Sequence, residues 1–184
     1  MWTRSFLIMH GVENRRPAEH WQHDLAYQLR QRGEQVFYPQ LPDPDRPSLD
    51  AWLDLIDAEL AMTEGERVVV AHSLGAIAWL HAAARGAVAD RVLLVSPPGP
   101  SAFAWDVIAP FDPAALDQPV TARLACSDND PYCPEGAAEA YGRLLGGDVD
   151  VLPGAGHITI ADGYGPWPSA LAWCADPATR LTAR

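Results

Sequence analysis

The chain has 184 residues, of which 48% are hydrophobic and 20% are charged, and its formal net charge at pH 7 is −11. Such a length and composition are typical of one globular domain that buries about two thirds of its unfolded surface. The negative charge argues against nucleic acid and anionic membranes as partners, because both would repel the protein.

The cysteine content and the apolar runs predict where the protein resides. Cys126, Cys133 and Cys174 form no C-x-x-C pair and are odd in number, so we expect no disulfide framework. The apolar run at residues 6–9 is too short for the core of a signal peptide. No stretch approaches the roughly 20 apolar residues that cross a membrane. We therefore expect a soluble, cytoplasmic protein.

The first half of the chain alternates between two hydrophobic patterns. Continuous apolar runs typical of buried strands cover residues 6–9, 35–38 and 67–71. Amphipathic patterns typical of helices cover residues 17–31, 48–63 and 74–84. Gly33 is suited to end the first helix, and Ser48 is suited to cap the second.

The second half continues this alternation. Strand patterns cover residues 92–96, 120–126 and 149–152, and helix patterns cover residues 134–145 and 168–175. The connection 97–119 is long enough for a short helix or flap but not for a large lid domain. We predict a single domain over residues 1–175, followed by a loose C-terminal tail over residues 176–184.

Apolar strands that alternate with amphipathic helices predict a mostly parallel sheet of about six strands, covered by helices on both faces. The fold class is therefore α/β, a three-layer sandwich. Right-handed crossovers bring the carboxyl ends of all strands to one edge, where open sheets of this kind bind ligands. We therefore expect the functional residues directly after the strands.

The most informative segment is His72-Ser73-Leu74-Gly75, which lies between an apolar strand pattern and a helix pattern. A serine on such a sharp turn exposes its hydroxyl, and the following helix directs main-chain N–H groups toward it. The segment resembles the G-x-S-x-G nucleophile elbow, with Ala71 in place of the first glycine. The alternative is that Ser73 only caps a helix.

A serine nucleophile needs a general base, and the base needs a carboxylate to orient it. His157 lies in a glycine-rich loop after the last strand, and Asp130 lies in the loop after the fifth. The order serine, aspartate, histidine is the order of α/β-hydrolases. Asp128 lies in the same loop as Asp130 and competes with it, although it could instead form a turn.

Two main-chain N–H groups are needed to stabilise an oxyanion. We expect them from Leu74, which follows the serine, and from Val12, which follows the first strand. Other residues near this edge are candidates for lining a substrate pocket, although their aromatic members are more often core residues: His10, Gly11, His20, Trp21, Pro97, Trp105 and Trp167.

His20 and His23 are spaced as a helical pair of metal ligands would be, but further ligands at a convincing spacing are missing from the sequence. We therefore predict neither a metal site nor a cofactor.

The motifs together resemble one family of small serine hydrolases, the retinoblastoma-binding-protein-nine and YdeN type. They are H-G near the N-terminus, H-W in the first helix, L-P-D-P, A-H-S-L-G, D-P-Y-C-P and G-A-G-H. The resemblance implies an α/β-hydrolase fold. It also implies that Ser73, Asp130 and His157 match the family's catalytic triad, with Asp130 directly before proline as in the family.

We expect a serine hydrolase that cleaves a small carboxylic ester or amide through a Ser73 acyl-enzyme. The sequence leaves three alternatives open: an acyltransferase with the same triad, a metal-dependent hydrolase, and a protein-interaction module without turnover. The substrate, a protein partner and the oligomeric state also stay open.

Overall fold

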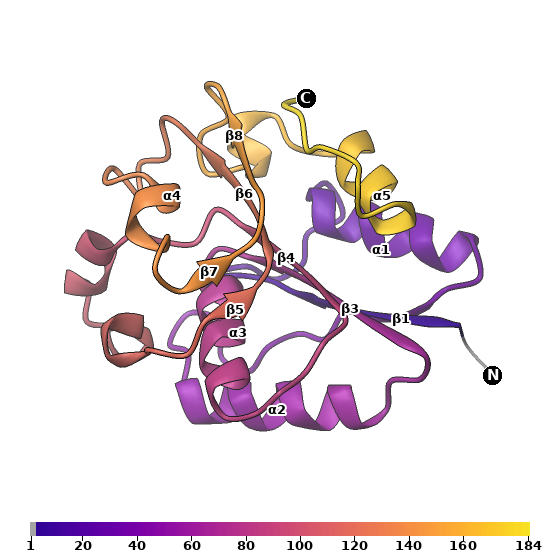
Figure 1. Ribbon diagram of the computed structural model, residues 1–184, viewed down its shortest axis with the longest axis horizontal. Helices are drawn as coiled ribbons and strands as arrows, with labels where there is room; N and C mark the ends of the chain where they lie inside the picture. Colours follow the sequence, from indigo (N-terminus) through magenta and orange to yellow (C-terminus); the bar gives the residue numbers. More distant parts are fainter. Residues whose placement is uncertain (1–2) are drawn as a thin grey trace.

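The computed structural model describes residues 3–184 and contains one six-stranded, entirely parallel sheet (Figure 1). Its strands are β1 (Arg4–Met9), β2 (Gln35–Phe37), β3 (Glu66–His72), β4 (Arg91–Val95), β6 (Arg123–Ser127) and β8 (Val149–Leu152). The helices are α1 (Trp21–Gln31), α2 (Leu49–Ala61), α3 (Leu74–Ala84), α4 (Ala137–Ala140) and α5 (Pro168–Ala175). The predicted α/β fold is confirmed.

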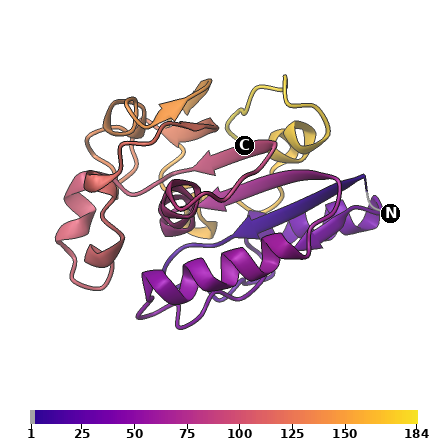
Figure 2. The same cartoon turned by 60° about the horizontal axis from the view of Figure 1, so that its bottom comes forward.

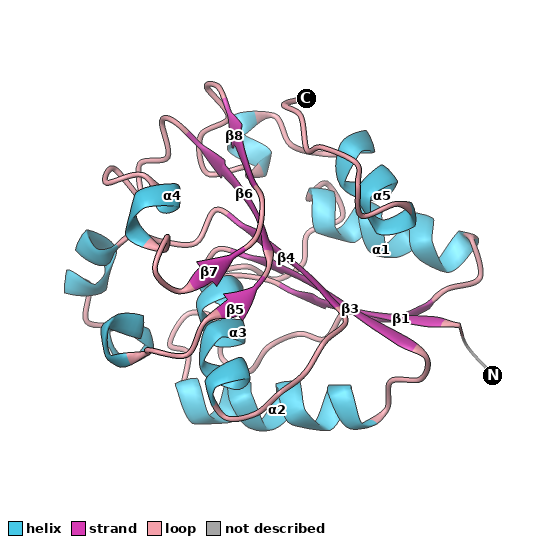
Figure 3. Ribbon diagram, viewed as in Figure 1, coloured by secondary structure: helices cyan, strands magenta, loops and turns pink. Residues whose placement is uncertain are grey.

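Side chains that alternate along the strands build a separate core on each face of the sheet. On one face Leu7, Val69 and Leu94 pack with α2 and α3. On the other face Phe6 and Val68 pack with α1 and α5. Figure 3 shows the helices in cyan on both sides of the sheet, and Figure 2 shows the same arrangement from another direction. The result is a three-layer sandwich.

The order of the strands locates the functional edge. The sheet runs β2-β1-β3-β4-β6-β8, so the chain leaves β1 toward one side and later returns to pair β3 on the other side. The strand order thus reverses beside the carboxyl ends of β1 and β3, which end at Met9 and His72. Ligands bind at such a reversal in open α/β sheets.

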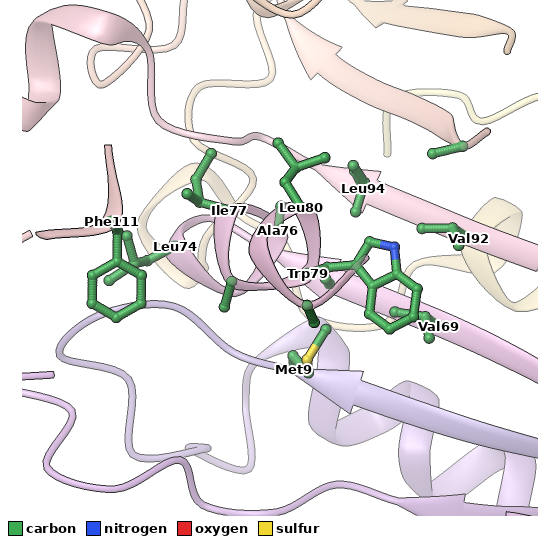
Figure 4. Close-up of a cluster of buried hydrophobic side chains, with 14 of the residues drawn as sticks. Met9, Val69, Leu74, Ala76, Ile77, Trp79, Leu80, Val92, Leu94 and Phe111 are labelled. Carbon is green, nitrogen blue, oxygen red and sulfur yellow. The ribbon is translucent and has the colours of Figure 1, made fainter. Parts of the chain in front are cut away.

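Helix α3 is buried on nearly all sides (Figure 4), because every residue in it except His81 is apolar or glycine, so the amphipathic pattern expected for it is wrong. Ile77, Trp79 and Leu80 contribute to the core that also contains Val69 and Leu94. A helix held this rigidly fixes the position of the residue before it, which is Ser73.

The predicted strand 120–126 is two strands in the structure. Val120–Thr121 forms β5, which pairs with β7 (Leu145–Gly146) in a small second sheet, and only β6 joins the main sheet. The chain changes sheets at Ala122, whose carbonyl oxygen would lie 2.1 Å from a Cβ on Gly147. Glycine at 147 permits this close approach.

The predicted helix 134–145 is wrong in extent, since α4 covers only Ala137–Ala140. Gly136 precedes it with a φ of 83°, and Leu145 pairs as a strand with Val120. The apolar residues of the segment are still buried, because Tyr141 and Leu144 belong to the same core as α3. Burial and helix formation are therefore separate properties of this sequence.

The connection between β4 and β5 holds three short 3-10 helices, η1 (Pro100–Ala104), η2 (Ala109–Phe111) and η3 (Pro113–Ala115), and no lid domain, as predicted. The C-terminal segment 176–184 contains no helix or strand, but it is not the loose tail we expected. Leu181 is buried and donates its N–H to Asp150, and the carbonyl of Thr182 accepts from the Trp167 indole.

Candidate active site

Ser73 lies on a strained turn between β3 and α3. Its backbone angles are φ 55° and ψ −128°, a conformation that non-glycine residues rarely adopt. The turn is held by the Ser73 N–H, which donates to the Val95 carbonyl at 2.9 Å, and by the Ser73 carbonyl, which accepts from Ala76. Ala71, where the motif has glycine, is fully buried and compatible with this sharp turn.

Two glycines allow the loop after β1 to approach the turn. A Cβ on Gly75 would lie 2.5 Å from the His10 carbonyl oxygen, so only glycine lets α3 cross β1 this closely. A Cβ on Gly11 would lie 2.9 Å from the Ser73 Oγ and 3.4 Å from the Leu74 nitrogen. The β1 loop therefore forms one wall of the site around the serine.

Ser73, His157 and Asp130 form a continuous hydrogen-bonded chain. The two Asp130 oxygens lie 3.0 and 2.9 Å from His157 Nδ1, and His157 Nε2 lies 2.9 Å from Ser73 Oγ. A carboxylate accepts hydrogen bonds, so Nδ1 bears the proton and the serine hydroxyl donates to Nε2. This arrangement allows the hydroxyl to lose its proton to the imidazole when the oxygen attacks a carbonyl carbon.

The loops that bear Asp130 and His157 are joined residue by residue. The Ser127 hydroxyl accepts from Ala155 N–H at 3.0 Å, Asp128 accepts from Gly154 N–H at 2.7 Å, and Asn129 accepts from Gly156 N–H at 2.8 Å. Asp128 thus holds the histidine loop, whereas Asp130 holds the imidazole itself. Of the two competing aspartates, only Asp130 contacts the His157 ring.

The main chain around His157 is strained and held from two sides. Gly156 and Ile158 both have positive φ, 59° and 55°. One Asp162 carboxylate oxygen accepts from the His157 N–H at 3.1 Å and from the Thr159 N–H at 3.0 Å. The His157 carbonyl in turn accepts from His72 Nε2 at 2.9 Å. Asp162 and His72 were not candidates from sequence, although the T-x-x-D spacing of Thr159 and Asp162 is a capping signal.

Val12 and Leu74, the two residues expected to supply oxyanion N–H groups, both line the cleft. Within residues 3–184 neither N–H donates to an acceptor, so both are available to a ligand. The Gly11 carbonyl accepts from His10 Nδ1 at 2.8 Å, while His10 Nε2 accepts from Leu41 N–H at 2.9 Å. His10 thereby fixes the orientation of the peptide unit that contains the Val12 N–H.

A cleft of about 900 Å³ opens in front of Ser73. Of the predicted pocket residues, Gly11, His20 and Trp105 line it, together with Ser73, His157, Val12 and Leu74. Sequence reasoning missed lining residues from four loops, which follow β1, β4, β6 and β8; they include Glu13, Asn14, Arg15, Pro98, Ser101, Ala102, Ile108, Pro131, Tyr132, Thr159 and Ile160.

Four predicted pocket residues do not line the cleft. His10 is buried beneath it, and Pro98 rather than Pro97 borders it. Trp21 and Trp167 belong to the core on the α1 and α5 face. The Trp21 indole donates to the Ile158 carbonyl at 3.0 Å and thus supports the histidine loop from below.

Burial lowers the pKa of three histidines near the site. The pKa values of His10 and His20 fall to about 4, and that of His72 falls well below its ordinary value. All three imidazoles are therefore neutral at neutral pH. Burial also raises the pKa of the Cys133 thiol to about 12, which leaves this cysteine protonated and unreactive.

Among residues 3–184, no group of three or more histidine, cysteine or acidic side chains is placed to hold a metal ion. Over the same residues, no helix combines the length and apolar character that crossing a membrane requires.

The sheet topology and the site together define an α/β-hydrolase. The family model described as serine hydrolase matches residues 6–175, and the chain belongs to this family. The protein is therefore an enzyme of the hydrolase class. No curated protein matches the chain in sequence.

Solved structures with the same fold include YdeN-like proteins. A proposed YdeN-like hydrolase from Pectobacterium atrosepticum is 25% identical with a TM-score of 0.73, covering 95% of this chain and 90% of its own. The ydeN gene product from B. subtilis is 20% identical with a TM-score of 0.80, and the match covers 94% of this chain and 97% of that protein. Est1E from Butyrivibrio proteoclasticus is 14% identical with a TM-score of 0.63, and the match covers 85% of this chain and 81% of that protein.

Proposed function

We propose that this enzyme hydrolyses carboxylic esters or amides through a covalent intermediate on Ser73. The observation that most strongly supports this proposal is the hydrogen-bonded chain from Asp130 through His157 to Ser73 Oγ, with a 2.9 Å contact at the serine. The two free N–H groups of Val12 and Leu74 border the same cleft and could stabilise an oxyanion.

In the first half of the reaction, Ser73 Oγ attacks the carbonyl carbon and forms a carbon–oxygen bond, while its proton passes to His157 Nε2. Asp130 orients the imidazole and stabilises its positive charge. The N–H groups of Val12 and Leu74 donate to the carbonyl oxygen as it becomes negative. The bond to the leaving alcohol or amine then breaks, and the leaving atom takes the proton from His157.

In the second half, a water molecule gives a proton to His157 Nε2 and attacks the acyl carbon. The carbon–oxygen bond to Ser73 breaks, the acid is released, and the serine oxygen regains its proton from His157. No step in this sequence uses a metal or cofactor. If an alcohol replaced the water, the same steps would transfer the acyl group, which is the acyltransferase alternative.

The proposal is tested by steady-state hydrolysis of ethyl acetate and acetamide by the wild type and by Ser73→Ala, His157→Ala and Asp130→Asn. We expect hydrolysis in the wild type, and a loss of kcat of about 10³-fold or more in each variant. Product analysis with added methanol separates hydrolysis from transfer. Turnover in Ser73→Ala equal to that of the wild type would refute the proposal.

A further inference from the structure

Large apolar side chains are exposed around the cleft. Among residues 3–184, seven such side chains are exposed, and three of them, Trp105, Tyr132 and Ile160, line this one cleft. Their exposed fractions are 42%, 56% and 43%. They come from separate segments, since Trp105 follows η1, Tyr132 follows β6, and Ile160 begins η4 (Ile160–Asp162). An apolar surface that converges on a reactive group is typical of a ligand site.

Two of these side chains lie on the histidine side of the cleft. The Tyr132 ring lies 4.6 Å from the His157 ring, measured between centroids and at an angle of 59°. The Tyr132 N–H also donates to Asp130 Oδ1 at 2.9 Å, which fixes the tyrosine relative to the carboxylate. Ile160 follows His157 by three residues in the same loop.

Polar residues line the part of the cleft that the β1 loop contributes. Glu13, Asn14 and Arg15 line the cleft directly after Val12, whose N–H is the expected oxyanion donor. Arg15 forms an exposed ion pair with Asp45 and is well hydrated. Tyr132 and Ile160 therefore form an apolar wall on the histidine side of the cleft, while polar residues follow Val12 in the β1 loop.

The chemistry of the reaction decides which part of a substrate lies against this apolar wall. The imidazole must donate its proton to the leaving atom, so the leaving group lies on the His157 side. We propose that the enzyme prefers substrates whose leaving alcohol or amine has a large apolar body, bound against Tyr132 and Ile160. This inference rests on the proposed function and specifies the substrate class of the same site.

The test compares acetate esters that differ only in their alcohol. Ethyl acetate and 3-phenylpropyl acetate release alcohols of similar acidity, so their intrinsic reactivity is similar. We expect kcat/KM for 3-phenylpropyl acetate to exceed that for ethyl acetate by at least about tenfold. This is the lower end of the range of specificity that added apolar contacts in a pocket provide. Ethyl 4-phenylbutyrate, with the apolar body on the acyl side, should show no such gain over ethyl acetate.

Variants assign the preference to the apolar wall. In Tyr132→Ala the ratio of kcat/KM between the two acetates should fall to near one. In Tyr132→Phe, which keeps the ring, it should be retained. Tyr27→Ala is a matched control, because Tyr27 is 53% exposed but lies on α1 outside the cleft lining. It should keep the wild-type ratio.

Two different results separate failure of this inference from failure of the proposed function. If the wild type hydrolyses both acetates equally and Ser73→Ala hydrolyses neither, the preference is refuted while the serine mechanism stands. A higher kcat/KM for ethyl 4-phenylbutyrate but not for 3-phenylpropyl acetate would also refute the preference. If Ser73→Ala hydrolyses both esters as well as the wild type does, the proposed function itself fails.

Discussion

A Cβ on Gly11 would lie 2.7 Å from the Cβ of Ser73, so the two residues approach more closely than a side chain at position 11 would permit. Because a real Cβ does not come so near to a neighbouring carbon, any side chain at Gly11 must displace the serine or the β1 loop. The glycine therefore lets the β1 loop, which also bears Val12, lie directly against the serine.

Gly11→Ala should lower kcat/KM by about 100-fold, because displacing a reacting group by about 1 Å costs that much. The loss of stability should be smaller, about 1–3 kcal/mol, as for other overpacked sites. Gly146→Ala is the control, since a Cβ there meets nothing within 4 Å. Ester hydrolysis and urea denaturation of both variants check this, and an active Gly11→Ala enzyme would contradict it.

Asp162 should act as a positioning residue for His157. Asp162→Ala removes the acceptor for the main-chain N–H groups of His157 and Thr159, so the strained histidine loop loses its support. We expect kcat to fall by about 10- to 100-fold with little change in KM. Asp162→Asn keeps an acceptor oxygen and should restore part of kcat. Equal KM increases in both variants, with kcat unchanged, would argue against this role.

Stability should fall in mild acid because of the buried histidines. His10 and His20 have a pKa of about 4 in the folded protein, below the ordinary value of 6.5. Between these values the unfolded chain binds more protons, so the free energy of unfolding decreases as pH falls from about 6.5 to about 4. Above pH 6.5 these groups contribute no pH dependence.

The variant His20→Asn tests this origin of the pH dependence. Asparagine is a good N-cap and can replace the His20 ring nitrogen that accepts from Gln22 N–H. The slope of the unfolding free energy between pH 4 and 6.5 should decrease by up to about 1.4 kcal/mol per pH unit. Urea denaturation at several pH values measures it, and an unchanged slope would show that His20 does not titrate on unfolding.

The ion pair between β6 and β8 should be important for stability and not for catalysis. The Asp150 carboxylate is buried and accepts from Arg123 at 3.1 Å and from Leu181 N–H at 3.0 Å. Asp150→Ala should destabilise the protein by about 3 kcal/mol, because it removes the buried partner of Arg123 and the acceptor of the Leu181 N–H. Asp148→Ala removes an exposed partner of the same arginine and should cost less than about 1 kcal/mol. Chemical denaturation compares the two.

The sequence was sufficient to predict the parallel sheet and the main residues that follow its strands. Strand patterns predicted where each strand ends, and a parallel sheet brings those ends together. For this reason Ser73 and His157, which are far apart in the chain, were expected to be neighbours, and their side chains lie 2.9 Å apart. Their catalytic roles are part of the proposed function.

Other features depend on three-dimensional packing that a hydrophobic pattern does not encode. Trp21 and Trp167 are large aromatic residues near the edge, but only the fold decides that they pack with each other, with ring centroids 5.2 Å apart. Trp105 has the same residue type and lines the cleft. Asp162 accepts from the His157 and Thr159 N–H groups, and its T-x-x-D spacing indicates a helix cap but not that the cap also holds the histidine loop.

The end of the predicted helix at residues 134–145 was missed for a related reason. Its apolar spacing fits a helix, yet Gly136, with its positive φ, delays the start of the helix, and the pairing of β5 with β7 uses Leu145 as a strand residue. The expected loose tail was wrong because Leu181 contributes an apolar side chain to the core. The expected cytoplasmic location stays a prediction.

The most direct test of the proposed mechanism is to find the atom that an active-site-directed fluorophosphonate modifies. Peptide mass spectrometry of the treated wild type should show a single adduct on Ser73, with none in Ser73→Ala and much slower labelling in His157→Ala. A folded wild-type enzyme that stays unlabelled, or is labelled at another residue, would contradict the assignment of Ser73 as the nucleophile.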